Sequence, residues 1–216
     1  DSSMTATLIF GGTFDPVHFG HLRSALALLD LFDDAQLVMI PCQIPVHRPQ
    51  PAADEKHRLN MLNLAVEEER SITIDDCELR REGKSFTFDT LRMYRKQWPD
   101  APHYFVLGGD AWVTLTTWYR WQELINFAHL TVLTRPGEPM IESPELKSWA
   151  GPITAELGAI SAKAGNVVRL TLKPFEMSAT AVRTALAAGR SVADCVPNNV
   201  INYIQANRLY RKSHDR

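Results

Sequence analysis

The chain has 216 residues, of which 45% are hydrophobic, so it is long enough to bury a sizeable core. Its formal net charge of −2 offers no basic surplus for nucleic acid, and no Lys/Arg run marks a helix that lies on a membrane. No apolar run approaches the length of a membrane span, and no signal peptide is recognised. Three scattered cysteines form no disulfide framework or metal motif, so we expect a cytoplasmic protein.

Strands and helices are predicted in alternation along the chain. Short apolar runs predict strands over residues 5–10, 36–40, 71–79, 103–107, 130–133 and 166–172. Apolar residues at helical spacing predict helices that begin near residues 18, 55, 87, 121, 178 and 200, with Thr87 and Ser178 as caps. This order indicates an α/β fold with a doubly wound parallel sheet and right-handed crossovers. Ligands of such sheets bind beyond the carboxyl ends of the strands.

We expect one domain over residues 4–216, since no repeat or low-complexity segment divides the chain. Residues 1–3 precede Met4 and are interpreted as a remnant outside the fold. Residues 136–165 are rich in Gly and Pro and weakly patterned, so they are predicted to be a mobile, variable insertion. Residues 178–216 form a C-terminal helical part.

The turn after the first predicted strand carries the most informative motif, GGTFDPVHFGHL at residues 11–22. Gly11 and Gly12 allow the backbone to approach a ligand closely. The helix that follows offers an anion its free N–H groups and its positive dipole end. His18 and His21 are three residues apart, so their rings can point the same way and suit a chain of phosphates. A zinc site would need a third ligand at a suitable spacing, which is missing.

A second helix start, after the last predicted strand, also suits phosphate. Ser178 and Thr180 supply hydroxyl donors, and Arg183 supplies a planar cation. Alone, this stretch would be an ordinary helix cap with a surface arginine. Together, the two helix starts can hold one triphosphate from two sides.

Two other nucleotide-binding motifs are excluded. Gly83, Lys84 and Ser85 look like the end of a P-loop, but Glu78 stands where a P-loop needs its first glycine. No G-x-G-x-x-G motif is present, which argues against a dehydrogenase.

Residues 11–22 resemble the signature of the nucleotidylyltransferase superfamily, with His18-Phe19-Gly20-His21 as its His-x-Gly-His motif. Residues 177–183 resemble its second signature, Ile-Ser-x-Thr-x-x-Arg, with Met177 in place of Ile. From residue 8 to about residue 210 the chain resembles the bacterial nicotinate-nucleotide adenylyltransferases. Further matching motifs are PVHRP at 45–49, SFT at 85–87, GGD at 108–110, TWY at 117–119 and RPG at 135–137.

The resemblance implies a reaction and a set of site residues. ATP and nicotinate mononucleotide would give deamido-NAD and pyrophosphate in NAD synthesis, with Mg²⁺ bound to ATP and no dedicated metal site in the protein. The catalytic residues it implies are His18, His21 and Arg183. The ATP-binding residues it implies are Gly11, Gly12, Thr13, Phe14, Gly20, Ser178, Thr180 and Arg183. The substrate-binding residues it implies are His47, Arg48, Thr87, Gly108, Asp110, Trp118, Tyr119 and Arg135.

The resemblance also implies particular contacts. Asp110 would accept hydrogen bonds from a ribose, and Trp118 would stack on the pyridine ring. The backbone N–H groups of Thr87 and Tyr119 would meet the nicotinate carboxylate. Nearby phosphates are expected to favour the protonated forms of His18 and His21.

Three alternatives stay open at this point. The first is a sister adenylyl- or cytidylyltransferase, for instance one that acts on phosphopantetheine. The second is a nucleotide-binding regulator that keeps the fold without turnover. The third, a fragment of a class I aminoacyl-tRNA synthetase, lacks a basic face for tRNA. No feature of the sequence defines an oligomeric state.

Overall fold

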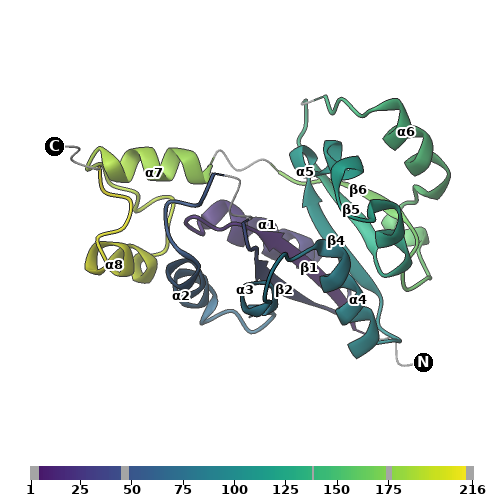
Figure 1. Ribbon diagram of the computed structural model, residues 1–216, viewed down its shortest axis with the longest axis horizontal. Coiled ribbons are helices and arrows are strands. Elements are labelled where there is room, and N and C mark those ends of the chain that lie inside the picture. The colour runs from purple at the N-terminus through teal and green to yellow at the C-terminus, as the bar shows by residue number, and fades with distance from the viewer. Residues whose placement is uncertain (1–4, 45–48, 138, 174–176, 213–216) are drawn as a thin grey trace.

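A parallel sheet of six strands forms the centre of the molecule (Figure 1). The computed structural model describes residues 5–44, 49–137, 139–173 and 177–212. The strand order is β3-β2-β1-β4-β5-β6. This order confirms the doubly wound, Rossmann-like α/β class, because the chain winds outward from β1 on one side and from β4 on the other. The strands are β1 (Ala6–Gly12), β2 (Ala35–Pro41), β3 (Ile72–Ile74), β4 (His103–Gly108), β5 (His129–Thr134) and β6 (Val167–Thr171).

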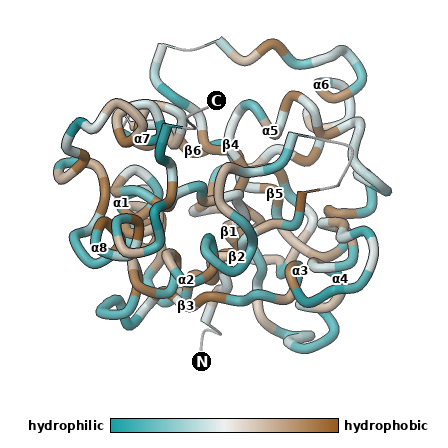
Figure 2. The backbone as a smooth tube through the Cα atoms, turned by 60° about the vertical axis from the view of Figure 1, so that its left-hand side comes forward, coloured by the Kyte–Doolittle hydropathy of each residue, from teal (hydrophilic) through white to brown (hydrophobic). Residues whose placement is uncertain are grey.

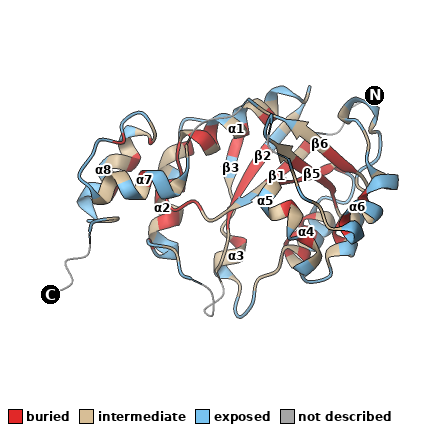
Figure 3. Ribbon diagram, turned by 90° about the horizontal axis from the view of Figure 1, so that it is seen from above, coloured by how far each residue is buried: buried red, intermediate tan, exposed pale blue. Residues whose placement is uncertain are grey.

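The central strands are buried on both faces, which explains why they read as apolar runs. Leu8 and Met39 belong to the core on one face of the sheet. Their chain neighbours Ile9 and Val38 belong to the core on the other face. Successive side chains of a strand point to opposite faces, so each strand feeds both cores. Figure 3 shows this burial as red segments along the sheet.

Helices cover both faces of the sheet. One core is closed by α1 (Phe19–Asp30), α2 (Glu55–Val66), α7 (Ala179–Ala187) and α8 (Asn198–Ala206). The other is closed by α4 (Thr87–Gln97), α5 (Gly109–Val113) and α6 (Pro144–Ala150). α7 and α8 lie together at one end of the molecule and α6 at the opposite end (Figure 1). Hydrophobic and hydrophilic residues alternate along α1, α7 and α8 (Figure 2), as expected of helices with one face on a core.

Shorter elements fill the connections. They are α3 (Cys77–Arg80), η1 (Leu115–Thr117), η2 (Trp121–Asn126), η3 (Gly151–Ile153) and η4 (Leu157–Ala159), where η denotes a 3-10 helix. Within the described ranges, no helix has the length and hydropathy needed to span a membrane.

The switch in strand order lies between β1 and β4, which are paired neighbours. β1 leads into α1 and β2 on one side, and β4 leads into α5 and β5 on the other. Both turns therefore leave the same edge of the sheet in opposite directions. A crevice at such a point is where ligands of this fold class bind.

Three predicted elements differ from the structure. The strand predicted over residues 71–79 is limited to Ile72–Ile74, because the Asp75 carboxylate accepts a hydrogen bond from the backbone N–H of Cys77 (2.9 Å) and the chain turns into α3. Thr87 is the first residue of α4 and not its cap; the cap is Phe86, which makes no side-chain capping bond. The helix predicted at residue 121 is the 3-10 helix η2.

Residues 136–165 contain a helix that the weak pattern did not predict. Leu146 and Ala150 of α6 are buried, so this part of the segment belongs to the core and not to a loose insertion. Ser143 caps α6 by accepting a hydrogen bond from the N–H of Leu146 (3.2 Å), and Pro144 follows it. A Ser-Pro start is a helix signal that the Gly and Pro content of the segment obscures.

Candidate active site

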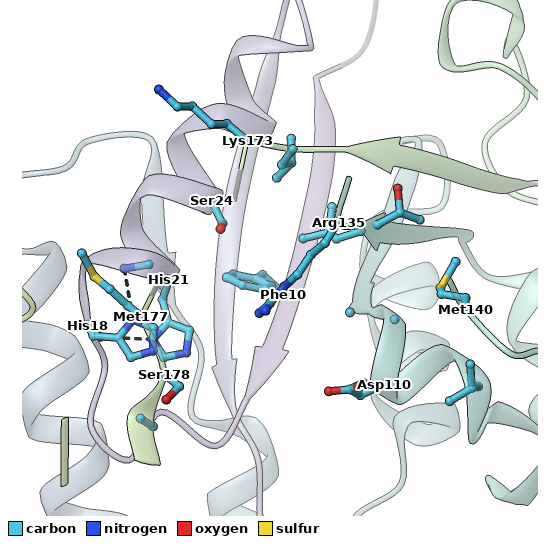
Figure 4. Close-up of a pocket in the computed structure, with 18 of the residues that line it drawn as sticks. Phe10, His18, His21, Ser24, Asp110, Arg135, Met140, Lys173, Met177 and Ser178 are labelled. Carbon is cyan, nitrogen blue, oxygen red and sulfur yellow. Dashed lines mark hydrogen bonds between the residues drawn. The ribbon is translucent and has the colours of Figure 1, made fainter. Parts of the chain in front are cut away.

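A pocket of about 570 Å³ lies at the switch point, on the carboxyl side of β1, β4 and β5 (Figure 4). Ligand sites of this class have volumes of roughly 300–1,000 Å³. Two turns far apart in the chain form one wall: the turn into α1 and the turn into α7. The lining residues from these turns are His18, Gly20, His21, Ser24, Met177, Ser178 and Ala179.

The two histidines share an arrangement fixed by backbone N–H groups. Nδ1 of His18 accepts from the N–H of Gly20 (3.0 Å), and Nδ1 of His21 accepts from the N–H of His18 (3.1 Å). The rings stack with centroids 3.7 Å apart (Figure 4). A ring nitrogen that accepts carries no proton, so the proton of each neutral ring lies on Nε2. Each imidazole can therefore donate to a phosphate through Nε2–H.

Burial keeps both histidines neutral near pH 7. It lowers the pKa of His18 to about 4. It lowers the pKa of His21 to about 3, with the neighbouring His18 as a second cause. Protonation would also place a hydrogen on Nδ1, facing a backbone N–H. The geometry is thus that of neutral donors and differs from the protonated imidazoles expected beside phosphates.

The start of α1 presents its hydrogen-bond donors differently from the prediction. The N–H of Phe19 donates to the carbonyl of Cys195 (2.7 Å), and the N–H of Gly20 donates to His18. These groups are not free to meet an anion directly. The imidazoles of His18 and His21 instead offer their Nε2–H groups as hydrogen-bond donors to the pocket.

Gly20 and Gly12 make room for aromatic rings. A Cβ atom at Gly20 would lie 2.8 Å from the His18 ring. A Cβ atom at Gly12 would lie 3.0 Å from the ring of Phe14, which stands edge-on to His21 with centroids 5.0 Å apart. Phe14 is buried and has a left-handed backbone (φ 52°). The turn residues Gly11, Gly12, Thr13 and Phe14 are not among the described lining residues.

Of the second set of predicted phosphate-binding residues, Ser178 lines the pocket, and Thr180 and Arg183 lie outside its described lining. Ser178 lines the pocket and caps α7 by accepting from the N–H of Ala181 (3.1 Å). Arg183 donates through Nη1 to the backbone carbonyl of Asp15 (2.8 Å) and through Nη2 to the hydroxyl of Thr180 (3.3 Å). Thr180 and Arg183 are paired with each other beside the pocket, outside its described lining.

The opposite wall comes from β4, β5 and the segment after β5. Gly108, Asp110 and Arg135 line it, and all three are among the residues for which the resemblance implies substrate binding. Figure 4 shows Asp110 across the space from His18 and His21, whereas the Arg135 side chain extends from that side toward Phe10. Among the described residues, no group of three or more His, Cys, Asp or Glu side chains is assembled as a metal site.

The aromatic residues predicted to bind the mononucleotide are not among the described lining residues of the pocket. Tyr119 stacks on Phe86 with ring centroids 4.5 Å apart and an angle of 28° between the rings. Trp118 donates through Nε1 to the hydroxyl of Thr114 (3.3 Å). Thr87 begins α4 directly after Phe86. The predicted residues His47 and Arg48 lie outside the described residues.

Sequence reasoning missed several residues of the site. Ser24 lines the pocket one helical turn after His21, a spacing that identifies it in retrospect. Arg58 is 1% exposed and donates through Nη1 to the carbonyls of Thr13 (2.8 Å) and Cys42 (3.1 Å). It fixes the turn after β1 to the end of β2, and its spacing to the buried Met61 and Leu62 of α2 is the sequence signal. Other lining residues that were missed include Phe10, Met140 and Lys173.

The fold and the two helix starts at the pocket define a nucleotidyltransferase of the α/β class. A family model described as cytidylyltransferase-like matches residues 9–185. The chain belongs to this family and, within it, to the nicotinate-nucleotide adenylyltransferases.

Similar proteins support this assignment over nearly the whole chain. Nicotinate-nucleotide adenylyltransferase of Escherichia coli O6:H1 is 38% identical over 207 residues, which cover 94% of this chain and 97% of that protein. A Hahella chejuensis protein named "Probable nicotinate-nucleotide adenylyltransferase" is 42% identical over 207 residues, 94% of each chain. The structure of Plasmodium falciparum nicotinic acid mononucleotide adenylyltransferase complexed with NaAD shares the fold, with a TM-score of 0.73 at 17% identity. The alignment covers 98% of this chain and 100% of that chain.

Proposed function

We propose that this enzyme transfers AMP from ATP to nicotinate mononucleotide, with deamido-NAD and pyrophosphate as products, in NAD synthesis. Relatives that match 94% of the chain are named for this activity. The observation that carries the proposal is the stacked pair of His18 and His21 in the pocket at the switch point.

The histidines stabilise charge that develops during the transfer. A phosphate oxygen of the mononucleotide attacks the α-phosphorus of ATP in line, and the bond from that phosphorus to the pyrophosphate oxygen breaks. Negative charge grows on the leaving pyrophosphate, where the Nε2–H groups of His18 and His21 donate. Donors held in place before the reaction stabilise such charge without reorganising. The protein supplies positioning and charge stabilisation and forms no covalent intermediate.

The remaining ATP contacts come from the two turns. Ser178, Thr180 and Arg183 hold the β- and γ-phosphates, where hydroxyl and guanidinium donors match phosphate oxygens. The backbone of Thr13 and Phe14 lies near the reacting phosphate. The glycines that give the turn its shape are Gly11, Gly12 and Gly20.

The mononucleotide binds on the side of α4 and the 3-10 helices. Asp110, with Gly108 beside it, accepts from ribose hydroxyls, and Trp118 stacks on the pyridine ring. The backbone N–H groups of Thr87 and Tyr119 donate to the nicotinate carboxylate. The basic residues proposed for this substrate site are Arg135, His47 and Arg48.

Mg²⁺ enters with ATP in this proposal. Mg²⁺ at nucleotide sites takes one or two carboxylates, substrate phosphates and water as ligands. Asp110 is the carboxylate among the described lining residues, so the donor set fits a cation carried mainly by the triphosphate. When bound, Mg²⁺ neutralises phosphate charge.

Pyrophosphate release by His18→Ala and His21→Ala tests the proposal. Each variant is expected to lower kcat by about 10²–10³-fold at saturating ATP, the scale of losing one preorganised donor. His57→Ala is the control, because His57 bonds Tyr203 through Nδ1 (2.6 Å) in the contact between α2 and α8. An unchanged kcat in either pocket variant would contradict the role given to that histidine.

A further inference from the structure

Asp15 connects four separate segments of the chain behind the pocket. Asp15 is 5% exposed. Oδ2 accepts from the N–H of Ala52 (2.8 Å), and Oδ1 accepts from the N–H of Ala53 (3.0 Å). Oδ1 also accepts from the hydroxyl of Tyr210 (2.7 Å), 195 residues further along the chain. α7 is reached through Arg183, so the four segments are the turn of Asp15 itself, residues 52–53, α7 and the segment of Tyr210.

Arg183 lies close to Asp15 without a tight ion pair. Its Nη1 donates to the backbone carbonyl of Asp15 at 2.8 Å, whereas Nη1 and Oδ2 are 3.9 Å apart. A close, bidentate pair would commit the guanidinium to the carboxylate. The Asp15 carboxylate instead takes its closest donors from Ala52, Ala53 and Tyr210.

Tyr210 is held where its hydroxyl can act only as a donor to Asp15. Burial and the Asp15 carboxylate raise the pKa of Tyr210, so the hydroxyl keeps its proton at neutral pH. The chain returns to the site after α8 by way of two residues with left-handed backbone, Arg208 (φ 54°) and Tyr210 (φ 60°). The Tyr210 ring packs against the core that α7 and α8 cover.

We propose that Tyr210 is a positioning residue for ATP binding: its hydroxyl satisfies the Asp15 carboxylate and so leaves Arg183 available to the triphosphate. Without that hydroxyl, the buried carboxylate keeps the N–H groups of Ala52 and Ala53 but loses one donor, and a lost donor to a buried charge is costly. Arg183 is the nearby cation that replaces the donor, by closing the 3.9 Å separation. Asp15 then competes with phosphate for the guanidinium. This inference rests on the proposed role of Arg183 at the β/γ end of ATP.

Tyr210→Phe and Tyr203→Phe form a matched pair for the test. Each removes one phenolic hydroxyl from the C-terminal part of the chain and keeps the ring. The Tyr203 hydroxyl bonds His57 (2.6 Å) and Asn60 (3.0 Å), away from the pocket. We expect Tyr210→Phe to raise KM for ATP by about threefold to tenfold, the range of one lost hydrogen bond, with KM for the mononucleotide within about twofold. Tyr203→Phe is expected to lower thermal stability without changing KM for ATP.

Combining Tyr210→Phe with Arg183→Ala tests whether Tyr210 acts through Arg183. If it does, Tyr210→Phe adds no further rise in KM for ATP once Arg183→Ala is present, because no cation remains at position 183. An equal rise in both backgrounds would overturn the inference, and so would a Tyr210→Phe enzyme that behaves like Tyr203→Phe. Should Tyr210→Phe not fold, Tyr210→Leu removes the same hydroxyl and must give the same ATP-specific rise.

The role of Arg183 in ATP binding and the effect of Tyr210 on Arg183 are contradicted by different results. If Arg183→Ala raises KM for ATP and Tyr210→Phe does not, Tyr210 only fastens the C-terminal segment, and the proposed role of Arg183 stands. If Arg183→Ala leaves KM for ATP unchanged, the role of Arg183 is wrong, and the inference about Tyr210 is overturned with it.

Discussion

At the start of α1, the side chains of His18 and His21, and not the first backbone N–H groups, supply the hydrogen-bond donors for an anion. The first N–H groups of α1 donate to Cys195 and His18 within the protein, and the imidazoles carry the donor positions outward to Nε2. The residue types and their spacing predict the pair, because three residues place two rings on one side of a helix start. Their neutral state could not be predicted, since it follows from the burial of His18 and His21 by distant segments.

We expect substitution of Gly20, which lies between His18 and His21, to lower kcat substantially, as we also expect for substitution of either histidine. Gly20→Ala would place a Cβ atom 2.8 Å from the His18 ring, so the ring must leave its position over the helix start. Misplacing a catalytic group by about 1 Å can cost about 10²-fold in rate, and we expect a loss of kcat approaching that size. Steady-state pyrophosphate release measures it.

Gly158→Ala is the matched control for Gly20→Ala. A Cβ atom at Gly158 meets no atom within 4 Å, so kcat and thermal stability should stay close to those of the wild type. A Gly20→Ala enzyme that also keeps its kcat would show that the His18 ring can move without loss of function.

At the level of elements, the strands were predictable and several helices were not. β1, β2, β4 and β5 are buried on both faces, so their apolar runs identify them directly. α3 and α6 have four and seven residues, too few for a helical period to emerge from the sequence. α4 begins after Phe86 without a side-chain cap, so tertiary packing sets its start where sequence signals favour Thr87.

Two serine caps allow the effect of a lost cap on stability to be distinguished from an effect on ATP binding. Ser143 caps α6 away from the pocket, and Ser178 caps α7 at the pocket. Replacing either with Ala should lower the free energy of unfolding by about 0.5–2 kcal/mol, as measured by chemical denaturation. Ser178→Ala should in addition raise KM for ATP by about threefold to tenfold, because it removes a phosphate donor. Equal KM values for ATP in the two variants would exclude Ser178 from the ATP site.

At the level of the whole molecule, the site depends on contacts between distant segments. Arg183 reaches Asp15 across 168 residues, and Tyr210 reaches it across 195. Motif matching identifies Arg183 and includes Asp15 within residues 11–22, but it gives no indication that the two are partners, and nothing in the local pattern marks Tyr210. Such residues are identified only when the fold brings the segments together.

The proposed pyridine site is built around two backbone N–H groups, and this favours an acid over an amide. Thr87 begins α4, a helix of 11 residues, so its N–H lies at a positive dipole end. A carboxylate only accepts hydrogen bonds, whereas an amide presents one acceptor and an NH₂ donor. Two backbone N–H groups, of Thr87 and Tyr119, satisfy a carboxylate but leave unpaired polar groups opposite an NH₂.

We therefore expect kcat/KM for nicotinate mononucleotide to exceed that for nicotinamide mononucleotide by at least about 10²-fold. Sites built on such hydrogen bonds reject an analogue that lacks the matching group by up to about 10⁴–10⁵-fold. Tyr119 is 49% exposed, and solvent that reaches the mismatched amide should reduce the discrimination below that limit. A coupled pyrophosphate assay with the two mononucleotides side by side measures the ratio. Equal use of both would contradict the acid-specific site, and turnover of neither would contradict the proposed reaction itself.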